Sequence, residues 1–272
     1  MIALFDSGYG GLTIFSAVRD RLPQYDYVYL GDNARTPYGT RSFDVVYRFT
    51  LEAVKTLFGL GADLVILACN TASAKALRTI QQNDLPRLDP TGRKRVLGII
   101  RPSAERLGLF TQTGHVGIMA TAGTVSSLSY VLEMRKLWPD VSVSQQACPL
   151  WVPLVENGEF DSPGADYFVG KYTRELLAQD DKIDAVMLAC THYPLLSPKI
   201  EKALPPGIRL LTQGSIVADS LADYLSRHSD LEASLPRGGS ARFFTTESPD
   251  KFAGTASLFF GGDLAVEHIE LA

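Results

Sequence analysis

Short, mostly apolar runs alternate with segments of helical period along nearly the whole chain, and this alternation constrains the fold more than any other feature. Such runs, without regular polar alternation, are typical of strands buried on both faces of a parallel sheet. The sequence therefore predicts an α/β fold in which helices cover mainly parallel sheets. The expected strands are Ile2–Phe5, Tyr27–Leu30, Leu64–Ala68, Val96–Ile100, Val116–Met119, Val141–Ala147, Ala185–Ala189 and Ile208–Leu211. The expected helices are Leu12–Arg21, Phe43–Phe58, Ala72–Gln82, Val125–Leu137, Asp166–Ala178 and Ile216–Ser226.

The pattern of one strand is written twice in the chain. "DLVILACNT" occupies residues 63–71, and "DAVMLACTH" occupies residues 184–192. A second match links the apolar run that ends at Asp6 to the run that ends at Thr121, because a small residue and a glycine follow each of them. Many α/β chains look self-similar, but the two matches together predict two similar doubly wound domains. We expect them to be related by pseudo-twofold symmetry, with an active site in the cleft between them.

Two polar or turn-rich stretches are the best candidates for connections between the halves. The first is "NDLPRLDPTGRKR" at residues 83–95, and the second begins with "PPG" at residue 205. We therefore expect one domain of residues 1–95 plus 210–272 and another of residues 96–209.

Composition excludes several classes of partner. The formal net charge of −4 is spread along the chain, without a basic block of the kind that binds nucleic acid. No apolar run is long enough to cross a bilayer, and the opening "MIALFDSGYGG" lacks the basic and long apolar regions of a signal peptide. The three cysteines do not form a disulfide framework. We expect a cytoplasmic protein with reduced thiols and neither a nucleic-acid nor a membrane partner.

Cys69 and Cys190 end the two repeated strands. Functional side chains of open parallel sheets gather beyond the carboxyl ends of the strands, so two facing halves would bring both sulfur atoms to one cleft. Each cysteine has a candidate proton partner, since Asp6 ends the first strand of its half and His192 lies two residues beyond Cys190. Two equivalent thiols suit a symmetric task. One thiolate removes a proton from one face of a carbon, and the opposite thiol returns a proton to the other face.

Other roles for the two cysteines remain open. A cysteine at a strand end is often only a small buried apolar residue. A redox pair more often shows C-x-x-C spacing, and a zinc site made from Cys69, Cys190 and His192 lacks a second closely spaced pair. A hydrolase with a cysteine nucleophile needs one thiolate, a base and an oxyanion hole, and has no use for a second equivalent cysteine.

Proton removal from carbon makes further demands on such a site. A free thiol has a pKa of about 8.5, so even its thiolate is a weak base toward a carbon acid. The carbanion needs hydrogen-bond donors aimed at its carboxylate, in a site closed to water. Backbone amides and the hydroxyls of Ser7, Thr71 and Thr191 are suitable donors.

A series of distinctive segments spans nearly the whole chain in order. They are "FDSGYGGLTIFSAV" (5–18), "YLGDNARTPYGTRS" (29–42), "LACNTASAKAL" (67–77), "ATAGTVSS" (120–127), "ACPLWVPLVENGE" (147–159), "LACTHYPLL" (188–196) and "FFTTESPDKF" (243–252). Together they resemble the successive signatures of the glutamate racemase family, whereas "DSGxGG" alone would be a weak signal. The resemblance implies a cofactor-independent isomerase that needs no metal, interconverts L- and D-glutamate, and supplies D-glutamate for peptidoglycan synthesis in cell-wall biogenesis.

The resemblance also implies roles for individual residues. Cys69 would serve D-glutamate and Cys190 would serve L-glutamate as the paired acid/base residues, assisted by Asp6 and His192. The substrate-binding positions carried over by motif are Asp6, Ser7, Tyr38, Gly39, Asn70, Thr71, Thr191 and His192. Residues expected to act from the edge of the site are Asp32, Glu156, Thr121 and Thr124.

Several of these residues also have plain structural explanations. Asp6, Asn70 and Thr71 are suited to cap helices, a role compatible with a carboxylate bound at a helix N-terminus. Tyr38-Gly39 follows a proline, as in many turns. Residues whose role is equally explained by a turn or a helix cap are Glu156, Thr121 and Thr124. The remaining cysteine, Cys148, is expected to be a structural thiol.

Two other functions fit the same residues. A racemase or isomerase of another acidic substrate, such as aspartate or maleate, would share the cysteine pair and differ only in its pocket. A regulatory protein on the same fold, for example one acting on a topoisomerase, would need neither cysteine. The resemblance makes glutamate the expected small-molecule substrate. Because relatives are often dimers, we expect a homodimer as the assembly.

Overall fold

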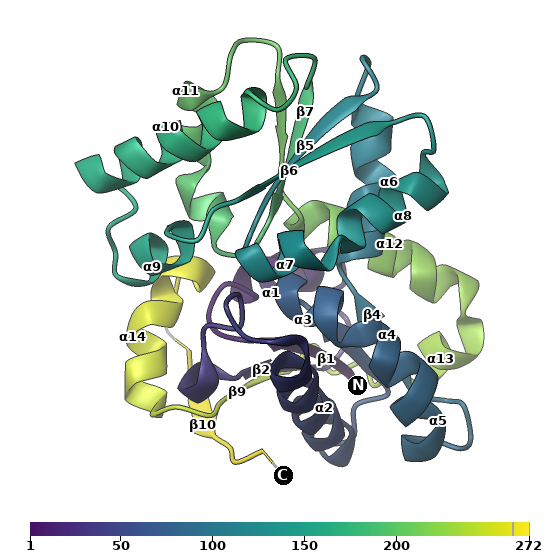
Figure 1. Ribbon diagram of the computed structural model, residues 1–272. Coiled ribbons are helices and arrows are strands. Elements are labelled where there is room, and N and C mark those ends of the chain that lie inside the picture. Colours follow the sequence, from purple (N-terminus) through teal and green to yellow (C-terminus); the bar gives the residue numbers. More distant parts are fainter. Residues whose placement is uncertain (263, 272) are drawn as a thin grey trace.

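The computed structural model describes residues 1–262 and 264–271, which form two β-sheets flanked by helices (Figure 1). The first sheet has six strands in the order β10-β9-β2-β1-β3-β4, and the second has four in the order β6-β5-β7-β8. All neighbouring strands pair in parallel. The predicted α/β fold with two parallel-sheet domains is confirmed.

The elements of the two halves have the following bounds. The first sheet consists of β1 (Ile2–Asp6), β2 (Tyr27–Gly31), β3 (Leu64–Leu67), β4 (Arg95–Gly98), β9 (Ala241–Thr245) and β10 (Val266–His268). The second consists of β5 (His115–Ala120), β6 (Ser142–Ala147), β7 (Ala185–Ala189) and β8 (Arg209–Leu211). The helices are α1 (Leu12–Arg21), α2 (Phe43–Gly59), α3 (Asn70–Lys75), α4 (Leu77–Thr79), α5 (Leu85–Leu88), α6 (Ile100–Phe110), α7 (Ala122–Ser127), α8 (Ser129–Leu137), α9 (Trp151–Glu156), α10 (Pro163–Leu177), α11 (Ser197–Ala203), α12 (Gly214–Arg227), α13 (Ser229–Ser234) and α14 (Pro249–Phe260).

The two sheets share one strand order. In the first sheet β1 lies between β2 and β3 with β4 beyond, and in the second β5 lies between β6 and β7 with β8 beyond. Strands β9 and β10 extend only the first sheet. The repeated sequence segments therefore occupy equivalent places, because β3 leads to Cys69 and β7 leads to Cys190. The repeat in the sequence corresponds to a repeat in topology.

Both expected domain divisions fall at strands of the two sheets. The division between residues 95 and 96 falls inside β4, which belongs to the first sheet, and the division between 209 and 210 falls inside β8, which belongs to the second.

Both faces of each central strand are buried, which explains why the strand runs lack polar alternation. In β1, Ile2 and Leu4 pack on the side of α1, whereas Ala3 and Phe5 pack on the side of α2. In β7, Leu188 and Met187 likewise belong to clusters on opposite faces. This alternation follows from the two-residue period of a strand.

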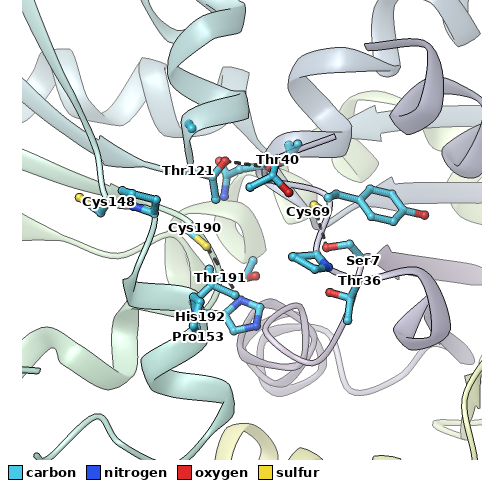
Figure 2. A pocket seen from close by; sticks show the side chains of 18 residues that line it. Ser7, Thr36, Thr40, Cys69, Thr121, Cys148, Pro153, Cys190, Thr191 and His192 are labelled. Carbon is cyan, nitrogen blue, oxygen red and sulfur yellow. Dashed lines mark hydrogen bonds between the residues drawn. The ribbon is translucent and has the colours of Figure 1, made fainter. Parts of the chain in front are cut away.

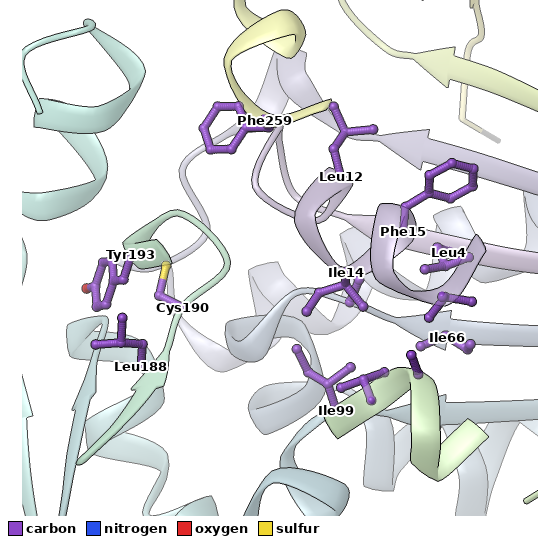
Figure 3. Close-up of a cluster of buried hydrophobic side chains, with 14 of the residues drawn as sticks. Leu4, Leu12, Ile14, Phe15, Ile66, Ile99, Leu188, Cys190, Tyr193 and Phe259 are labelled. Carbon is purple, nitrogen blue, oxygen red and sulfur yellow. The ribbon is translucent and has the colours of Figure 1, made fainter. Parts of the chain in front are cut away.

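One cluster of buried side chains joins the two halves (Figure 3). It includes Leu12, Ile14 and Phe15 of α1, together with Leu188 and Tyr193 from the second half. Helix α12 packs along α1, so the chain that returns from the second sheet also ties the halves together. Truncating the fully buried Phe15 to alanine would destabilise this junction by about 3–5 kcal/mol.

Two expected helices are interrupted. The segment expected to be helical at residues 125–137 is divided into α7 and α8 by Leu128, whose φ of 56° lies in the left-handed region. The segment expected at residues 72–82 contains α3, α4 and a π-helical turn at Ile80–Asp84. No helix in residues 1–262 and 264–271 is long and apolar enough to cross a membrane.

Candidate active site

A cavity of about 110 Å³ lies where the loops that follow the strands of both sheets meet (Figure 2). By the same measure a single water needs roughly 10–15 Å³, so the cavity has room for a small molecule. Its wall contains residues that follow all four central strands: Ser7 after β1, Cys69 after β3, Thr121 after β5 and Cys190 after β7. This is the position that open parallel sheets use for ligands.

The two cysteines of the repeat line this one cavity from different sides (Figure 2). Both are free thiols, and each side chain is largely buried with a narrow exposed face. Each follows the corresponding strand of its own sheet. The structure thus brings together the two sulfur atoms that the sequence repeat singles out.

Cys69 is held at the start of α3. The amide of Ala72 donates a hydrogen bond to Sγ at 3.4 Å, so the thiol caps the helix, and Ser7 Oγ lies 3.4 Å from the same sulfur. Burial raises the pKa of the Cys69 thiol to about 12, and the nearby negative charge of Asp6 adds to this rise. The contacts with Ser7 and Ala72 oppose the rise. Cys69 is therefore a neutral thiol at rest, and its thiolate is a strong base for a thiolate.

Asp6, the last residue of β1, is almost completely buried and is not among the residues that line the cavity. Its Oδ2 accepts a hydrogen bond from the amide of Gly8 at 2.9 Å, whereas Oδ1 has no partner among the described residues. Burial raises the pKa of this carboxyl group, and the positive charge of His192 and the amides of Gly11 and Gly8 act in the opposite direction. A buried carboxyl group with a free oxygen is suited to exchange protons with a neighbouring thiol.

His192 links Cys190 to Glu156. Its Nδ1 lies 3.9 Å from Cys190 Sγ, a long contact for a hydrogen bond, and its Nε2 lies 2.9 Å from Glu156 Oε1. Burial alone would lower the pKa of His192, but its interactions with Cys190 and Glu156 outweigh burial and raise the pKa to about 10. The imidazole is therefore a cation near neutral pH, and it lies beside Cys190.

Glycines in the turn after β1 allow the two halves to approach closely. A Cβ atom at Gly10 would lie 2.3 Å from Thr191 Oγ1 and 2.5 Å from His192 Nδ1, and one at Gly11 would lie 2.5 Å from Asp6 Cβ. Across the same contact, Thr13 Oγ1 donates a hydrogen bond to the carbonyl of Thr191 at 3.3 Å. The turn therefore positions the loop of Cys190 against the first half.

Threonines bridge the halves on the side of α3 and α7. Thr71 Oγ1 lies 3.0 Å from Thr121 Oγ1 and 3.5 Å from Thr124 Oγ1. Thr121 also caps α7, since its Oγ1 accepts a hydrogen bond from the amide of Thr124 at 3.2 Å. Thr71 and Thr121 line the cavity, and Thr124 supports them from behind.

The loop of Tyr38 and Gly39 covers another side of the cavity, and both residues line it. The Tyr38 hydroxyl donates a hydrogen bond to Asp32, whose other oxygen accepts one from Thr246 Oγ1 at 2.8 Å. Asp32 is fully buried behind the loop and outside the cavity wall, where it also pairs with Arg35 Nε at 2.7 Å. The Gly39 carbonyl accepts a hydrogen bond from the amide of Gly123 at 2.8 Å, which ties the loop to the second half.

Several cavity residues were not predicted as part of the site. Those that line the wall without a predicted role in binding are Thr36, Pro37, Thr40, Ala122, Cys148, Pro149, Val152 and Pro153. Cys148 is fully buried, and burial holds its pKa well above the ordinary value, so it contributes a neutral thiol to the wall. Pro149, Val152 and Pro153 follow β6. The rule that ligands bind beyond the carboxyl ends of parallel strands would have drawn attention to them.

The zinc alternative finds no support in the grouping of side chains. Within residues 1–262 and 264–271, no three His, Cys, Asp or Glu side chains are grouped so that they could hold a metal ion. His192 instead points its second nitrogen at Glu156, and Cys69 pairs with Ser7.

Comparisons with known proteins agree with this architecture. The family model described as Asp/Glu/Hydantoin racemase matches residues 13–221. A glutamate racemase of Paracoccus denitrificans is 40% identical over 268 residues, which cover 95% of this chain and 96% of the relative. A crystal structure of a glutamate racemase isoform from Bacillus anthracis superposes with a TM-score of 0.89 at 32% identity, covering 100% of this chain and 97% of that one. A Francisella tularensis glutamate racemase solved with D-glutamate has a TM-score of 0.84 at 29% identity, covering 100% and 96%.

The matches extend over both sheets and both cysteine loops, because the family model alone runs from α1 to α12. The chain therefore belongs to the Asp/Glu/Hydantoin racemase family and, within it, to the glutamate racemases.

Proposed function

We propose that this chain interconverts L- and D-glutamate by cofactor-independent transfer of the α-proton between two cysteines, and so supplies D-glutamate for peptidoglycan. The observation that carries the proposal is that Cys69 and Cys190, from matching places in two halves, line one small cavity. Full-length similarity to relatives named glutamate racemase supports glutamate as the substrate. Aspartate and maleate remain the substrates to test against it.

The reaction begins with one cysteine as the thiolate and the other as the thiol. With L-glutamate bound, the Cys190 thiolate takes the α-proton, so an S–H bond forms as the Cα–H bond breaks. The electron pair left on Cα is delocalised into the α-carboxylate, and the Cys69 thiol then donates its proton to the opposite face. The product is D-glutamate, with Cys69 as the thiolate and Cys190 as the thiol. D-glutamate passes through the same steps in reverse.

The neighbours of each cysteine supply what its role requires. His192 places a positive charge beside Cys190, whereas burial and Asp6 keep Cys69 protonated until it donates. After donation, the same burial makes the Cys69 thiolate a stronger base toward D-glutamate. Asp6 and His192 are each suited to return the two thiols to their starting states.

The cavity also supplies hydrogen-bond donors for the substrate carboxylates. The hydroxyls of Thr71 and Thr191 lie in its wall, together with the amide side chain of Asn70 at the first turn of α3. Because these donors are fixed and largely shielded from water, they stabilise the negative charge that develops on the carboxylate more strongly than solvent does.

Exchange of the α-hydrogen in D₂O tests the proposal. The wild type should convert each glutamate enantiomer to the racemate with deuterium at Cα, and should leave aspartate and maleate unchanged. Cys69→Ser and Cys190→Ser should each abolish racemisation, while Cys148→Ser, which removes a thiol from the same wall, should retain exchange of both enantiomers. Racemisation at the wild-type rate by both single variants would contradict the two-base assignment.

Three broader assignments belong to the same proposal. Similarity to the racemase family supports a homodimer, which sedimentation at several concentrations would test. Three unpaired cysteines are consistent with the reducing cytoplasm, which cell fractionation would test. The two sheets support a division near the predicted one of 1–95 plus 210–272 and 96–209, and limited proteolysis would test it.

A further inference from the structure

A buried polar cluster lies where the chain returns from the second sheet to the first. It consists of Asn70, Ser103, Tyr130 and Gln213, which are 3%, 0%, 0% and 2% exposed. They come from the first turn of α3, from α6, from α8 and from the position directly before α12. Only Asn70 lines the cavity of the two cysteines, so the other three do not touch a ligand there.

Gln213 connects the members of the cluster. Its Oε1 accepts a hydrogen bond from Asn70 Nδ2 at 2.6 Å, and its Nε2 lies 3.2 Å from Asn70 Oδ1, so the two amide groups face each other in a reciprocal pair. The same Nε2 lies 2.7 Å from Ser103 Oγ and 2.9 Å from the Tyr130 hydroxyl. Tyr130 donates its own hydrogen to Asn70 Oδ1 at 2.8 Å.

The hydroxyl hydrogen of Ser103 determines which end of the Gln213 amide faces it. Ser103 donates its single hydroxyl hydrogen to the carbonyl of Ile99 at 2.6 Å, so its oxygen must accept from Gln213 Nε2. The second hydrogen of Gln213 Nε2 faces the Tyr130 and Asn70 oxygens. This arrangement favours the observed orientation of Gln213, because reversing its amide would place Oε1 2.7 Å from the Ser103 oxygen, whose single hydrogen is donated to Ile99.

Asn70 has one side-chain N–H that no residue of the cluster accepts. Its Oδ1 accepts from Tyr130 and Gln213, and one hydrogen of Nδ2 is donated to Gln213. The other hydrogen of Nδ2 has no acceptor among the described residues, and Asn70 is a wall residue of the cavity. A buried donor of this kind is strongly favoured to pair with an oxygen of a bound ligand.

We propose that Gln213 is a positioning residue for the reaction: with Tyr130 and Ser103 it locks the Asn70 amide so that its remaining N–H faces a carboxylate oxygen of the bound substrate. This inference rests on the proposed function and extends it to a residue outside the cavity. Gln213 directly precedes α12, and α12 packs on α1. The orientation of the Asn70 amide therefore also depends on the contact between the two halves.

Steady-state kinetics with both enantiomers tests this role in Gln213→Met and Tyr130→Phe, each of which keeps the side-chain volume. Loss of one hydrogen bond to a charged group corresponds to about a tenfold change or more in affinity. We therefore expect KM to rise about tenfold in Gln213→Met and less in Tyr130→Phe, with a smaller change in kcat. The control is Thr50→Val on α2, which removes a buried hydroxyl that donates to the Val46 carbonyl at 2.7 Å and should lower Tm without changing KM.

A double-mutant cycle separates positioning from general destabilisation. In an Asn70→Ala background, Gln213→Met should change KM by no more than about twofold, because its effect passes through the missing amide. An unchanged KM in folded Gln213→Met and Tyr130→Phe, or an equally large effect of Gln213→Met without Asn70, would overturn the inference. If Gln213→Met does not fold, Tyr130→Phe and its combination with Asn70→Ala decide the question. A wild type that racemises neither enantiomer would instead overturn the proposed function and this inference together.

Discussion

Glu156 Oε1 lies 2.9 Å from Nε2 of His192, whose other ring nitrogen faces Cys190. Carboxylate, imidazole and thiol thus form a line that ends in the cavity, and the raised pKa of His192 depends on the two outer groups. At Cys69 the nearby negative charge of Asp6 instead raises the pKa of the thiol. The two halves share a topology but place opposite charges near their cysteines, the His192 cation beside Cys190 and the Asp6 carboxylate near Cys69.

Removing the charge of Glu156 should move the alkaline limit of activity. Because Glu156 raises the pKa of His192 to about 10, Glu156→Gln should lower that pKa, and the cation beside Cys190 would be lost at lower pH. We expect kcat/KM near pH 8 to fall about tenfold, and the alkaline limb of the profile to shift downward. The equilibrium constant of a racemisation is one, so the shift must be identical for both enantiomers.

The matched control is Glu159→Gln, which removes a carboxylate from an exposed position three residues away. Its pH profile should coincide with that of the wild type. An unchanged alkaline limb in Glu156→Gln would show that the ion pair with His192 does not set the protonation state of the site.

The same raised pKa makes folding stability depend on pH. The pKa of His192 is about 6.5 in an unfolded chain and about 10 in the folded one, so the folded state binds the additional proton between these values. The stabilisation is complete below about pH 6.5 and is lost as pH rises toward 10, with a slope of at most about 1.4 kcal/mol per pH unit. Urea unfolding of wild type and His192→Gln from pH 6.5 to 8.5 should show a steeper decline for the wild type. Parallel curves would contradict the assignment.

Alkylation should report the environment of Cys69. With a pKa of about 12, only about one thiol in ten thousand is ionised at pH 8, so iodoacetamide should react slowly and about tenfold faster per pH unit. Asp6 raises this pKa and Ser7 lowers it. Asp6→Asn should therefore speed alkylation of Cys69, whereas Ser7→Ala should slow it. Peptide mass spectrometry distinguishes Cys69 from the other cysteines, and effects of the same sign in both variants would refute the account.

The sequence predicted the features that depend on residues close together in the chain. Strands buried on both faces are continuous apolar runs, and the repeated run that ends in cysteine located Cys69 and Cys190 at equivalent strand ends. Because loops at the carboxyl ends of parallel strands converge, two such strand ends were sufficient to predict one cleft. Asp6 was predicted from its place at the end of the first strand, and His192 from its distance of two residues beyond Cys190.

Features that depend on distant contacts were not predictable in this way. Gln213 contacts Asn70, Ser103 and Tyr130, and the four residues come from four separate segments. None of these segments has a local sequence pattern that indicates the cluster. The left-handed Leu128 that divides α7 from α8 is equally hidden, since leucine favours helices and rarely adopts this conformation. Asp32 was expected at the edge of the site, but only coordinates show that it accepts a hydrogen bond from the Tyr38 hydroxyl.

The turn after β1 provides the most direct test of how closely the halves must approach. A methyl group at Gly10 would lie 2.3 Å from Thr191 Oγ1 and 2.5 Å from His192 Nδ1, distances that no real Cβ contact tolerates. Gly10→Ala should therefore displace the loop of Cys190 by an ångström or so, and kcat/KM should fall about a hundredfold or more.

Gly59→Ala is the matched control, because a Cβ at the end of α2 meets no atom within 4 Å and alanine favours the helix. Racemisation assays combined with Tm measurements check both variants. Since the clash lies between the two halves and not within the core of either one, we expect Gly10→Ala to remain folded. Wild-type kcat/KM in Gly10→Ala would mean that the site does not require this approach.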